Sequence, residues 1–253
     1  MNKETILYFV AYFIIYSFVG WVLESVYKSV GQRKLVNSGF LIGPVCPIYG
    51  TGAILMILTL SSLKNNPILL FISAFFILSI LEYVVGFLLE KIFKTKYWDY
   101  SNLKFNIKGR VCLKNSIYWG LLGVIFICFI NPVVETHIKY IAMPILVYSE
   151  MLIGIWMAVD IVISVNEITS FETITNKINE LSETIKEKIE DENYMENVIK
   201  KLNRKQTKLK IKLYRRAIRM KRAFPSMKSE TITTFLNQKI DLKSLKDSIK
   251  NKE

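Results

Sequence analysis

The sequence predicts an all-α protein, namely a polytopic bundle of about five transmembrane helices followed by a helical, basic tail. Composition is the first observation behind this fold class: 51% of the 253 residues are apolar and the mean hydropathy is +0.30, although 22% are charged. The second is the distribution of charge, which is sparse up to Val165 and dense from Asn166 onward. An ordinary soluble enzyme does not segregate its residues in this way. We therefore expect a transmembrane domain at 1–165 and a cytoplasmic tail at 166–253, in which an acidic helix precedes a basic one.

Five apolar stretches approach the roughly 20 residues that a helix needs to cross a bilayer. They lie at about 6–23, 40–63, 67–89, 117–130 and 138–165. The fourth is short unless it begins near Val111, which would bring Lys114 and Asn115 into the membrane. The loops after the first and third stretches hold most of the loop Lys and Arg residues, and such loops stay on the cytoplasmic side. We therefore expect a multi-pass protein of the cell membrane, with its N-terminus outside and its tail inside.

The second predicted span is interrupted by residues that disfavour a smooth helix. Each proline removes a backbone donor and clashes with the preceding turn. At membrane depth, irregular backbone is tolerated only where protein or a water-lined cavity supplies partners, and broken helices line substrate sites in many transporters. The alternative is a surface loop before a span that starts near Tyr49. The interrupting residues are Gly43, Pro44, Pro47, Gly50 and Gly52.

Ionisable residues inside the predicted spans are candidate functional residues, because charge in the membrane is costly. Glu82 lies about fifteen residues into the third span, with Gly86 and Glu90 at four-residue steps along the same helical stripe. We expect Gly86 to admit a neighbouring helix. Lys114 or Arg110 is the expected ion-pair partner if Glu82 has only a structural role.

Other polar residues of the spans have two interpretations each. Glu24, at the inner end of the first span, is either a functional carboxylate or an interfacial group paired with Lys28. The full set of candidate buried polar or substrate-path residues is Glu24, Glu82, Glu90, Arg110, Lys114, Asn115, Glu150 and Asp160.

The loop at 96–110 is aromatic and basic, which is typical of a segment at the level of the lipid headgroups. We expect Trp98 and Tyr100 to be its membrane anchors, and Asp99 to pair with Arg110. Its role is left open between binding of phospholipid headgroups, closure of a cavity from the inside and docking of a soluble partner.

The tail has two predicted helices, and the formal net charge of the whole chain is +13. Apolar residues recur every three to four positions from Phe171 to Ile189, the pattern of an amphipathic helix, and a break is expected at 191–193. The stretch from Lys200 to Arg222 then contains twelve Lys or Arg residues and no acid.

Three interpretations of this basic helix are open. It could pack against the acidic helix as a hairpin, or it could adsorb to anionic lipid, since each Lys or Arg near such a surface contributes about 1 kcal/mol. Binding to nucleic acid is the weakest interpretation, because no nucleic-acid fold signature accompanies the charge. The residues expected to contact lipid are Lys200, Lys201, Arg204, Lys205, Lys208, Arg215, Arg216 and Arg219.

Motifs of several common chemistries are missing from the sequence. It has no GxxxxGK[ST], HExxH or GxSxG. Three distant cysteines and one histidine predict neither a disulfide framework nor a metal site. We therefore expect no enzymatic activity, no cofactor and no metal.

Four motifs occur in order between about Tyr8 and Trp119. They are GWVLE at 20–24, NSGFLIGPVCPIYGTG at 37–52, EYVVG with LEK at 82–91, and WDYS with FNIKGRVCL at 98–113. Together they resemble the bacterial "putative ABC-transporter type IV" (CmpB-like) integral membrane proteins. The resemblance implies a permease in a bacterial plasma membrane, with no particular substrate, and it does not reach the tail.

Two functions of different classes follow. The leading hypothesis is a transporter permease subunit that moves an unknown solute or lipid between the broken second span and the third. Glu82 would be the central charge, Glu90 and Arg110 a cytoplasmic gate, and Lys114 a counter-charge. If ATP supplies the energy, a separate ATPase subunit must bind the cytoplasmic loops or tail.

The alternative is a non-transporting membrane scaffold or sensor whose tail binds anionic lipid or a partner protein. An intramembrane enzyme acting on lipid ranks last, because no nucleophile and base are recognisable. Self-association into a homo-oligomer is left open.

Overall fold

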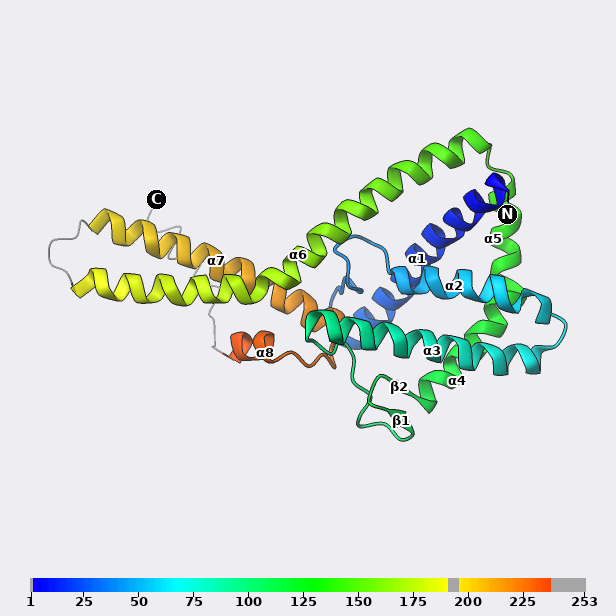
Figure 1. Ribbon diagram of the computed structural model, residues 1–253, viewed down its shortest axis with the longest axis horizontal. Helices are drawn as coiled ribbons and strands as arrows, with labels where there is room; N and C mark the ends of the chain where they lie inside the picture. The colour runs from blue at the N-terminus through cyan, green and yellow to red at the C-terminus, as the bar shows by residue number, and fades with distance from the viewer. Residues whose placement is uncertain (1, 191–195, 238–253) are drawn as a thin grey trace. The chain divides into compact units, whose positions relative to one another are not determined.

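The computed structural model describes residues 2–190 and 196–237, with side chains for all of these except 172, 186–190 and 196–200 (Figure 1). The protein is all-α, with 79% helix and 3% strand. It divides into two compact units. The first combines Met1–Ser164 with the short segment Arg222–Lys228, and the second combines Val165–Lys221 with Ser229–Glu253.

The first unit contains a helical bundle and one small hairpin. Four helical stretches are long and apolar enough to cross a membrane, and a fifth, Pro47–Leu63, is apolar but shorter. The elements in chain order are α1 Lys3–Gln32, α2 Pro47–Leu60 with the 3₁₀ turn η1 Ser61–Leu63, α3 Pro67–Phe93, β1 Asn106–Ile107, β2 Val111–Cys112, α4 Leu113–Ile125, η2 Phe126–Ile130, α5 Asn131–Lys139 and the start of α6 Met143–Glu190.

The ends of the long helices follow from local chemistry. Asn66 caps α3 by accepting a hydrogen bond from the Leu69 amide at 3.1 Å, and Pro67 occupies the first helical position, where it needs no donor. Asn2 caps α1 in the same way. Both helices end at a basic residue in the left-handed conformation, Arg33 with φ 49° and Lys94 with φ 50°.

The fourth span differs from its predicted range. It runs continuously from Leu113 to Lys139, because the five-residue π-helical segment η2 joins α4 to α5 without a break. Lys114 and Asn115 therefore lie in its first turn. A π-helix contains one residue more per turn than an α-helix would, which rotates the side chains that follow it.

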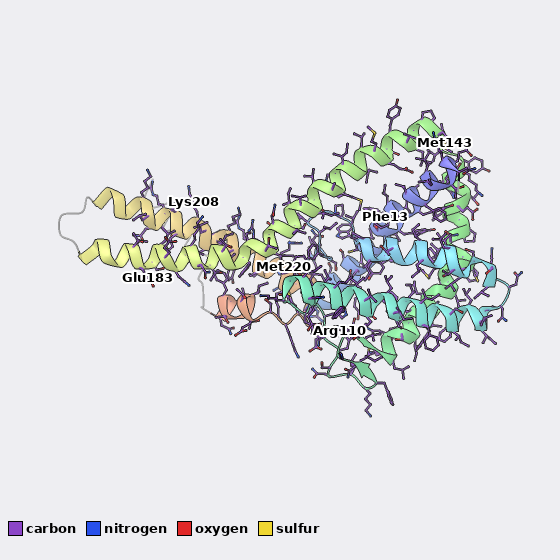
Figure 2. The ribbon with its side chains drawn as sticks, viewed as in Figure 1. Phe13, Arg110, Met143, Glu183, Lys208 and Met220 are labelled. Carbon is purple, nitrogen blue, oxygen red and sulfur yellow. The ribbon has the colours of Figure 1, made fainter. Side chains whose placement is uncertain are left out.

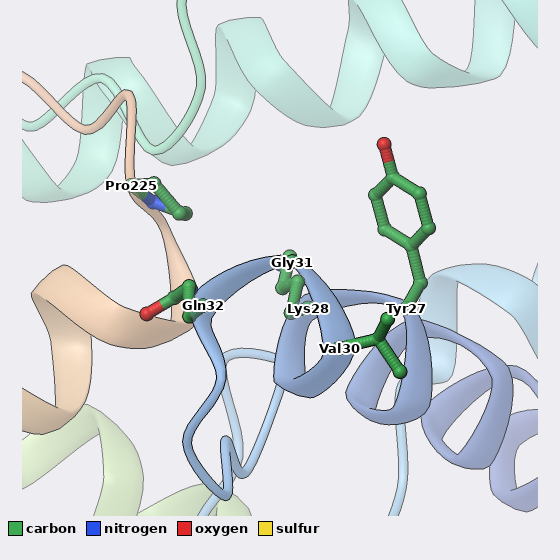
Figure 3. Close-up of a pocket in the computed structure, with 6 residues that line it drawn as sticks. All are labelled: Tyr27, Lys28, Val30, Gly31, Gln32 and Pro225. Carbon is green, nitrogen blue, oxygen red and sulfur yellow. The ribbon is translucent and has the colours of Figure 1, made fainter.

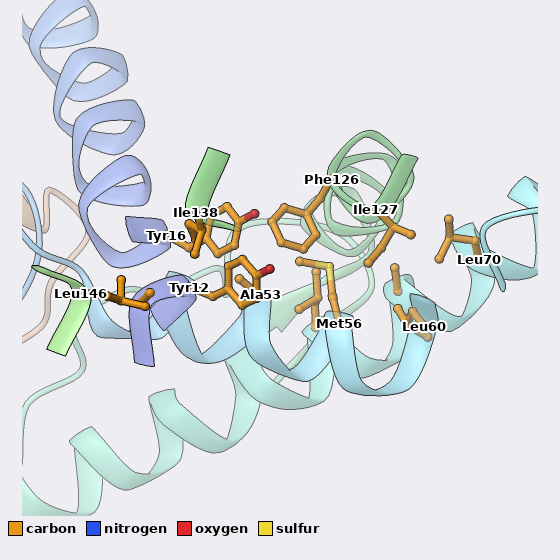
Figure 4. Close-up of a cluster of buried hydrophobic side chains, with 13 residues drawn as sticks. Tyr12, Tyr16, Ala53, Met56, Leu60, Leu70, Phe126, Ile127, Ile138 and Leu146 are labelled. Carbon is orange, nitrogen blue, oxygen red and sulfur yellow. The ribbon is translucent and has the colours of Figure 1, made fainter. Parts of the chain in front are cut away.

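The core of the first unit lies between α1, α2, α3 and the α4–α5 helix (Figure 4). Tyr12 and Tyr16 of α1 stack with ring centroids 6.1 Å apart, and the Tyr16 hydroxyl donates to Asn131 Oδ1 at 2.9 Å. Met56 of α2 and Phe126 of η2 are buried beside them. The outer faces of the long helices expose large apolar side chains, for example Ile68 and Phe76. This distribution is that of a membrane-integrated protein.

Small residues set the spacing of the helices. A Cβ atom on Gly50 would lie 2.3 Å from Ser17 Oγ and 2.5 Å from the Phe13 carbonyl oxygen. At this point α1 and α2 can therefore approach so closely only because residue 50 is a glycine. Gly123 similarly faces the Ala74 methyl group. Close contact of this kind drives helix association in membranes, where the hydrophobic effect is weak.

The second unit is built around a helical hairpin. The second half of α6 runs antiparallel to α7 Glu196–Ala223, and Figure 2 shows Glu183 and Lys208 on the two helices. Phe171 of α6 contacts Phe235 of α8 Glu230–Asn237, with ring centroids 5.7 Å apart. The buried apolar residues of the hairpin are Phe171, Ile178, Ile185, Leu213, Ala217 and Met220.

An ion pair and a hydrogen bond reinforce this hairpin. Arg216 Nε lies 3.0 Å from Glu167 Oε1, and the Gln206 amide donates to the Ile178 carbonyl. This is the arrangement that the hairpin interpretation of the basic helix predicts. The break expected at 191–193 lies outside the described residues.

Replacement of Gly50 by leucine should destabilise the fold, because the new side chain must push α1 away from α2. Overpacking of this kind typically costs about 1–3 kcal/mol. Thermal or SDS-induced unfolding of the purified protein measures the loss. Gly154→Leu is the matched control, since a Cβ atom there meets nothing within 4 Å. Equal stability of both variants would contradict the close packing of α1 on α2.

Candidate functional site

The segment between α3 and α4, residues 95–112, folds back along α3 instead of extending beyond it. We call it the α3–α4 loop. The Tyr100 hydroxyl donates to Glu82 Oε1 at 3.1 Å, and Arg110 Nη2 lies 2.8 Å from Glu90 Oε2. Glu82 precedes the end of α3 by eleven residues, or about 16 Å at 1.5 Å per residue. The loop therefore covers the last three turns of α3.

Glu82 is buried, with 6% of its surface exposed, and two neutral donors hold it. Tyr100 binds one carboxylate oxygen, and Trp119 Nε1 of α4 donates to the other at 3.0 Å. The alternative interpretation, an ion pair with Lys114 or Arg110, is wrong. Lys114 is exposed with its ammonium 6.0 Å from the Tyr118 ring, whereas Arg110 reaches α3 two turns further on, at Glu90.

Gly86 was predicted to admit a neighbouring helix. In the structure, a side chain of the α3–α4 loop lies against it instead. A Cβ atom on Gly86 would lie 3.0 Å from Trp98 Cζ2, and Trp98 Nε1 donates to the Arg110 carbonyl at 2.9 Å. Trp98 and Tyr100 thus contact α3 and its partners. The prediction that these two residues are outward membrane anchors is also wrong, because both side chains donate hydrogen bonds to other groups of the protein.

Asp99 fastens the loop to the segment Arg222–Lys228 and does not pair with Arg110. It accepts hydrogen bonds from Lys96 at 2.9 Å and from the Ser101 hydroxyl at 2.6 Å, and it pairs with Lys228. Burial acts to raise the pKa of the Asp99 carboxyl, but hydrogen bonds from Lys228, Ser101 and Lys96 outweigh it and hold the pKa well below its ordinary value.

Backbone pairing supports the same attachment. The Lys96 amide donates to the Lys228 carbonyl at 3.0 Å, and the Lys228 amide donates to the Lys96 carbonyl at 2.8 Å. The Phe224 ring packs on Tyr97 with centroids 5.0 Å apart. The segment Arg222–Lys228 is therefore an integral part of the first unit.

The irregular part of the second predicted span, residues 37–46, is enclosed by protein. The Gly43 amide donates to Asp160 Oδ2 at 2.8 Å, and the Ile42 amide donates to Asp160 Oδ1 at 3.1 Å. Ser164 Oγ also accepts from Ile42 at 3.1 Å. Asp160 thus satisfies amides that have no helical partner. The segment is therefore not a surface loop. The helix that follows it begins at Pro47, close to the start near Tyr49 that this alternative predicts, so the predicted second span at 40–63 begins too early.

The other interrupting residues are accommodated in different ways. Pro47 begins α2, and Gly50 and Gly52 lie inside this helix against α1 and α3 respectively. A Cβ atom on Gly43 would lie 2.4 Å from the Trp156 ring, so this glycine lets α6 close over the segment.

Glu24 is paired as its interfacial interpretation predicts. Lys28 Nζ lies 2.6 Å from Glu24 Oε1 and donates to Ser38 Oγ at 3.0 Å and to the Ala223 carbonyl. The Cys46 thiol donates to the other Glu24 oxygen at 3.6 Å. Glu24 therefore has two partners in the described structure.

Tyr49 connects the surroundings of Glu24 with those of Glu82. It lies in the first turn of α2 within electrostatic range of Glu24, Cys46, Tyr100 and Glu82. Its ring packs against Gly20 and lies 6.3 Å from Trp119. Sequence reasoning missed Tyr49 as a functional candidate, although it sits inside the broken segment. We call Glu24, Tyr49, Glu82 and Tyr100 the inner polar cluster.

The remaining candidates of the spans lie at other places. Asn115 interacts with the Tyr100 hydroxyl at the edge of the inner polar cluster. Glu150 is buried on α6 ten residues before Asp160, and its Oε1 has no hydrogen-bond partner within the described structure. The described part of the chain contains no group of three or more His, Cys, Asp or Glu side chains placed to hold a metal ion.

The basic residues expected on a lipid-binding tail divide into three sets. Lys201, Lys205, Lys208 and Arg215 are exposed. Arg204, Arg216 and Arg219 are half-buried, and the last two pair with Glu167. The side chain of Lys200 lies outside the described residues.

An apolar hollow opens at the C-terminal end of α1 (Figure 3). No carboxylate lines it, but its lining residue Lys28 pairs with Glu24 of the inner polar cluster. Its lining residues are Tyr27, Lys28, Val30, Gly31, Gln32 and Pro225.

Asp160→Ala should loosen the segment 37–46, because the Gly43 amide loses its acceptor and the Ile42 amide keeps only Ser164 Oγ. The buried Cys46 thiol, 3% exposed, should then react faster with a maleimide in a Cys128→Ser background. Ser149→Ala is the matched control on the same helix, since the Ser149 hydroxyl bonds only to the Leu146 carbonyl of its own turn. Unchanged labelling in Asp160→Ala would contradict the assigned role.

Comparison with known proteins addresses the same part of the chain. The model of the family described as "Putative ABC-transporter type IV" matches residues 11–165, which include both irregular segments and the inner polar cluster. Comparisons with curated proteins and with solved structures find no match. The match confirms the family predicted from the four sequence motifs and covers more than half of the protein. The chain therefore belongs to the putative ABC-transporter type IV family of membrane proteins.

Proposed function

We propose that the protein is the permease subunit of a transporter and that Glu82 is the charge at the centre of its solute path. The observation that carries the proposal is the burial of this carboxylate within a membrane-length apolar helix, between two neutral donors. A membrane-buried ionisable group is costly to maintain. Hydrogen bonds from Tyr100 and Trp119 leave its negative charge available to a proton, a cation or a cationic part of a solute.

The α3–α4 loop supplies the gate in this proposal. Tyr100 and Arg110 belong to a loop, so both contacts with α3 can open while α3 and α4 stay packed. Release of the Arg110–Glu90 pair and of Trp98 from Gly86 would uncover Glu82 from one side. The exposed position of Lys114 gives no support to its proposed part as a counter-charge.

Energy coupling and orientation are further parts of the proposal. The sequence has no P-loop, so an ATP-driven transporter needs a separate ATPase subunit. The basic loops and the basic tail support a plasma-membrane protein with the tail in the cytoplasm. The transported solute stays unspecified.

A second candidate function, a membrane scaffold or sensor, has its own supporting observation. Asp160 and Glu24 are bound by groups of the protein itself and need no solute to explain them. In a scaffold, the second unit would recruit the partners.

Glu82→Gln should abolish transport without unfolding the protein, because glutamine keeps the size and an acceptor oxygen but loses the charge. The measurement compares, by mass spectrometry, the compounds that accumulate in inverted native membrane vesicles with ATP. We expect at least a tenfold loss of any compound that depends on this protein. Glu135→Gln, at an exposed α5 pair, is the matched control. Wild-type accumulation in Glu82→Gln vesicles would contradict the proposed path.

Affinity purification from native membranes in mild detergent should recover a P-loop ATPase together with the protein. The permease proposal requires this partner if ATP drives transport. Mass spectrometry of the bound proteins, with an unrelated tagged membrane protein as the control, gives the result. Repeated recovery of signalling proteins without an ATPase would favour the scaffold.

A further inference from the structure

The α3–α4 loop has an outer face that the proposed function does not use. Its hairpin pairs Asn106 with Cys112 and Ile107 with Val111. At its first strand, Phe105 is 78% exposed and Ile107 is 59% exposed. Two exposed lysines, Lys104 and Lys108, flank this pair in the sequence. Large apolar side chains are rarely left in water without a partner when they cluster.

The hairpin is fixed at the depth of a membrane surface. Tyr100 and Arg110 attach the loop beside the last three turns of α3, and the Leu113 amide donates to the Phe105 carbonyl at 3.1 Å. Phe105 therefore lies at the first residue of the α4–α5 helix, which is itself long and apolar enough to cross a membrane. This level corresponds to the boundary between hydrocarbon and headgroups.

The charge around the hairpin is positive. Between Lys91 and Asn115 the only acidic residue is Asp99, whose side chain is 4% exposed and paired with Lys96 and Lys228. It therefore does not neutralise the lysines at the surface. The exposed lysines of this region are Lys91, Lys94, Lys104, Lys108 and Lys114.

We propose that this hairpin is a binding element for anionic phospholipid. Phe105 and Ile107 enter the apolar edge of the leaflet, and Lys104 and Lys108 extend to the phosphate groups. Lysine stems reach along apolar surface while their ammonium groups stay at the headgroups, and anionic lipid attracts them. The hairpin thus provides the contact with the membrane surface that the sequence predicts for Trp98 and Tyr100.

This proposal does not depend on transport. It adds a lipid contact to the same loop that binds Glu82 and Glu90, so lipid bound outside would hold the loop on α3. A soluble protein partner is the competing occupant of the same face. The position of the hairpin along the helix axes favours lipid over a soluble protein, because the loop lies beside the spanning helices and not beyond their ends.

The first test measures depth in the full-length protein reconstituted into nanodiscs of phosphatidylcholine with phosphatidylglycerol. A spin label at Phe105→Cys, in a Cys128→Ser background, should collide with oxygen and be shielded from a water-soluble nickel complex. Leu152→Cys, exposed on apolar α6, is the lipid reference, and Asn179→Cys, exposed on the second unit, is the water reference. A label at position 105 that matches the water reference would overturn the proposal.

The second test measures selectivity for the headgroup. Lys104→Gln with Lys108→Gln should reduce the preference for phosphatidylglycerol over phosphatidylcholine about fivefold or more in a lipid-retention assay by native mass spectrometry. Lys64→Gln with Lys139→Gln is the matched control, since both lysines are exposed, one just before α3 and the other at the end of α5. An unchanged preference, or shielding of position 105 only with a co-purified protein, would assign the face to another occupant.

Discussion

The hydrogen bonds from Ile42 and Gly43 to Asp160 are the contacts on which the arrangement of the first unit depends. Unpaired backbone amides are too costly to keep in hydrocarbon, and the amides of Ile42 and Gly43 obtain their acceptor from Asp160 of α6. Other amides of the irregular segment 37–46 bond to α1, as those of Ser38 and Cys46 do. The segment so held delivers Pro47 to the start of α2. That start in turn places Tyr49 against Gly20, in reach of both Glu24 and Glu82.

A similar constraint shapes the α3–α4 loop, which runs beside the last turns of α3. Its polar groups find partners on α3, within the loop and on the segment Arg222–Lys228, as Trp98 Nε1 does at the Arg110 carbonyl and Asp99 does at Lys228. The turn of the hairpin needs Gly109, because φ is +68° and a side chain would collide with Asp99. Phe40 joins the two irregular segments, since its ring lies 5.7 Å from that of Tyr97. The inner polar cluster is thus enclosed by two loops as well as by helices.

Hydropathy was sufficient to predict that the chain forms apolar helices and that Glu82 and Asp160 are buried, because a charged side chain inside an apolar helix is buried against protein. It did not predict the start of the second span, which is Pro47 and not about residue 40, and it could not identify the partners of the buried charges. The alternative of an ion pair for Glu82 rested on matching charges along the sequence, whereas the path of the loop depends on the tertiary contact of Trp98 with Gly86. Tyr49 was missed because an aromatic residue in an apolar run gives no sign of a polar neighbour. The length of the fourth span was underestimated because Asn131 and Pro132 resemble a helix end.

The π-helical segment Phe126–Ile130 has a consequence for how this family can vary in length. Deleting one residue there would restore regular helical winding and leave the hydropathy profile almost unchanged. Because the π-helical turn holds one extra residue, the helix downstream of such a deletion would keep its orientation, and Asn131 would still face Tyr16. The same deletion within the regular helix α4 would turn everything downstream by about 100° around the helix axis, since an α-helix has 3.6 residues per turn, and the buried hydrogen bond of Asn131 would be lost. The number of residues between the start of α4 and the π-helical segment is therefore as important to this helix as its apolar composition.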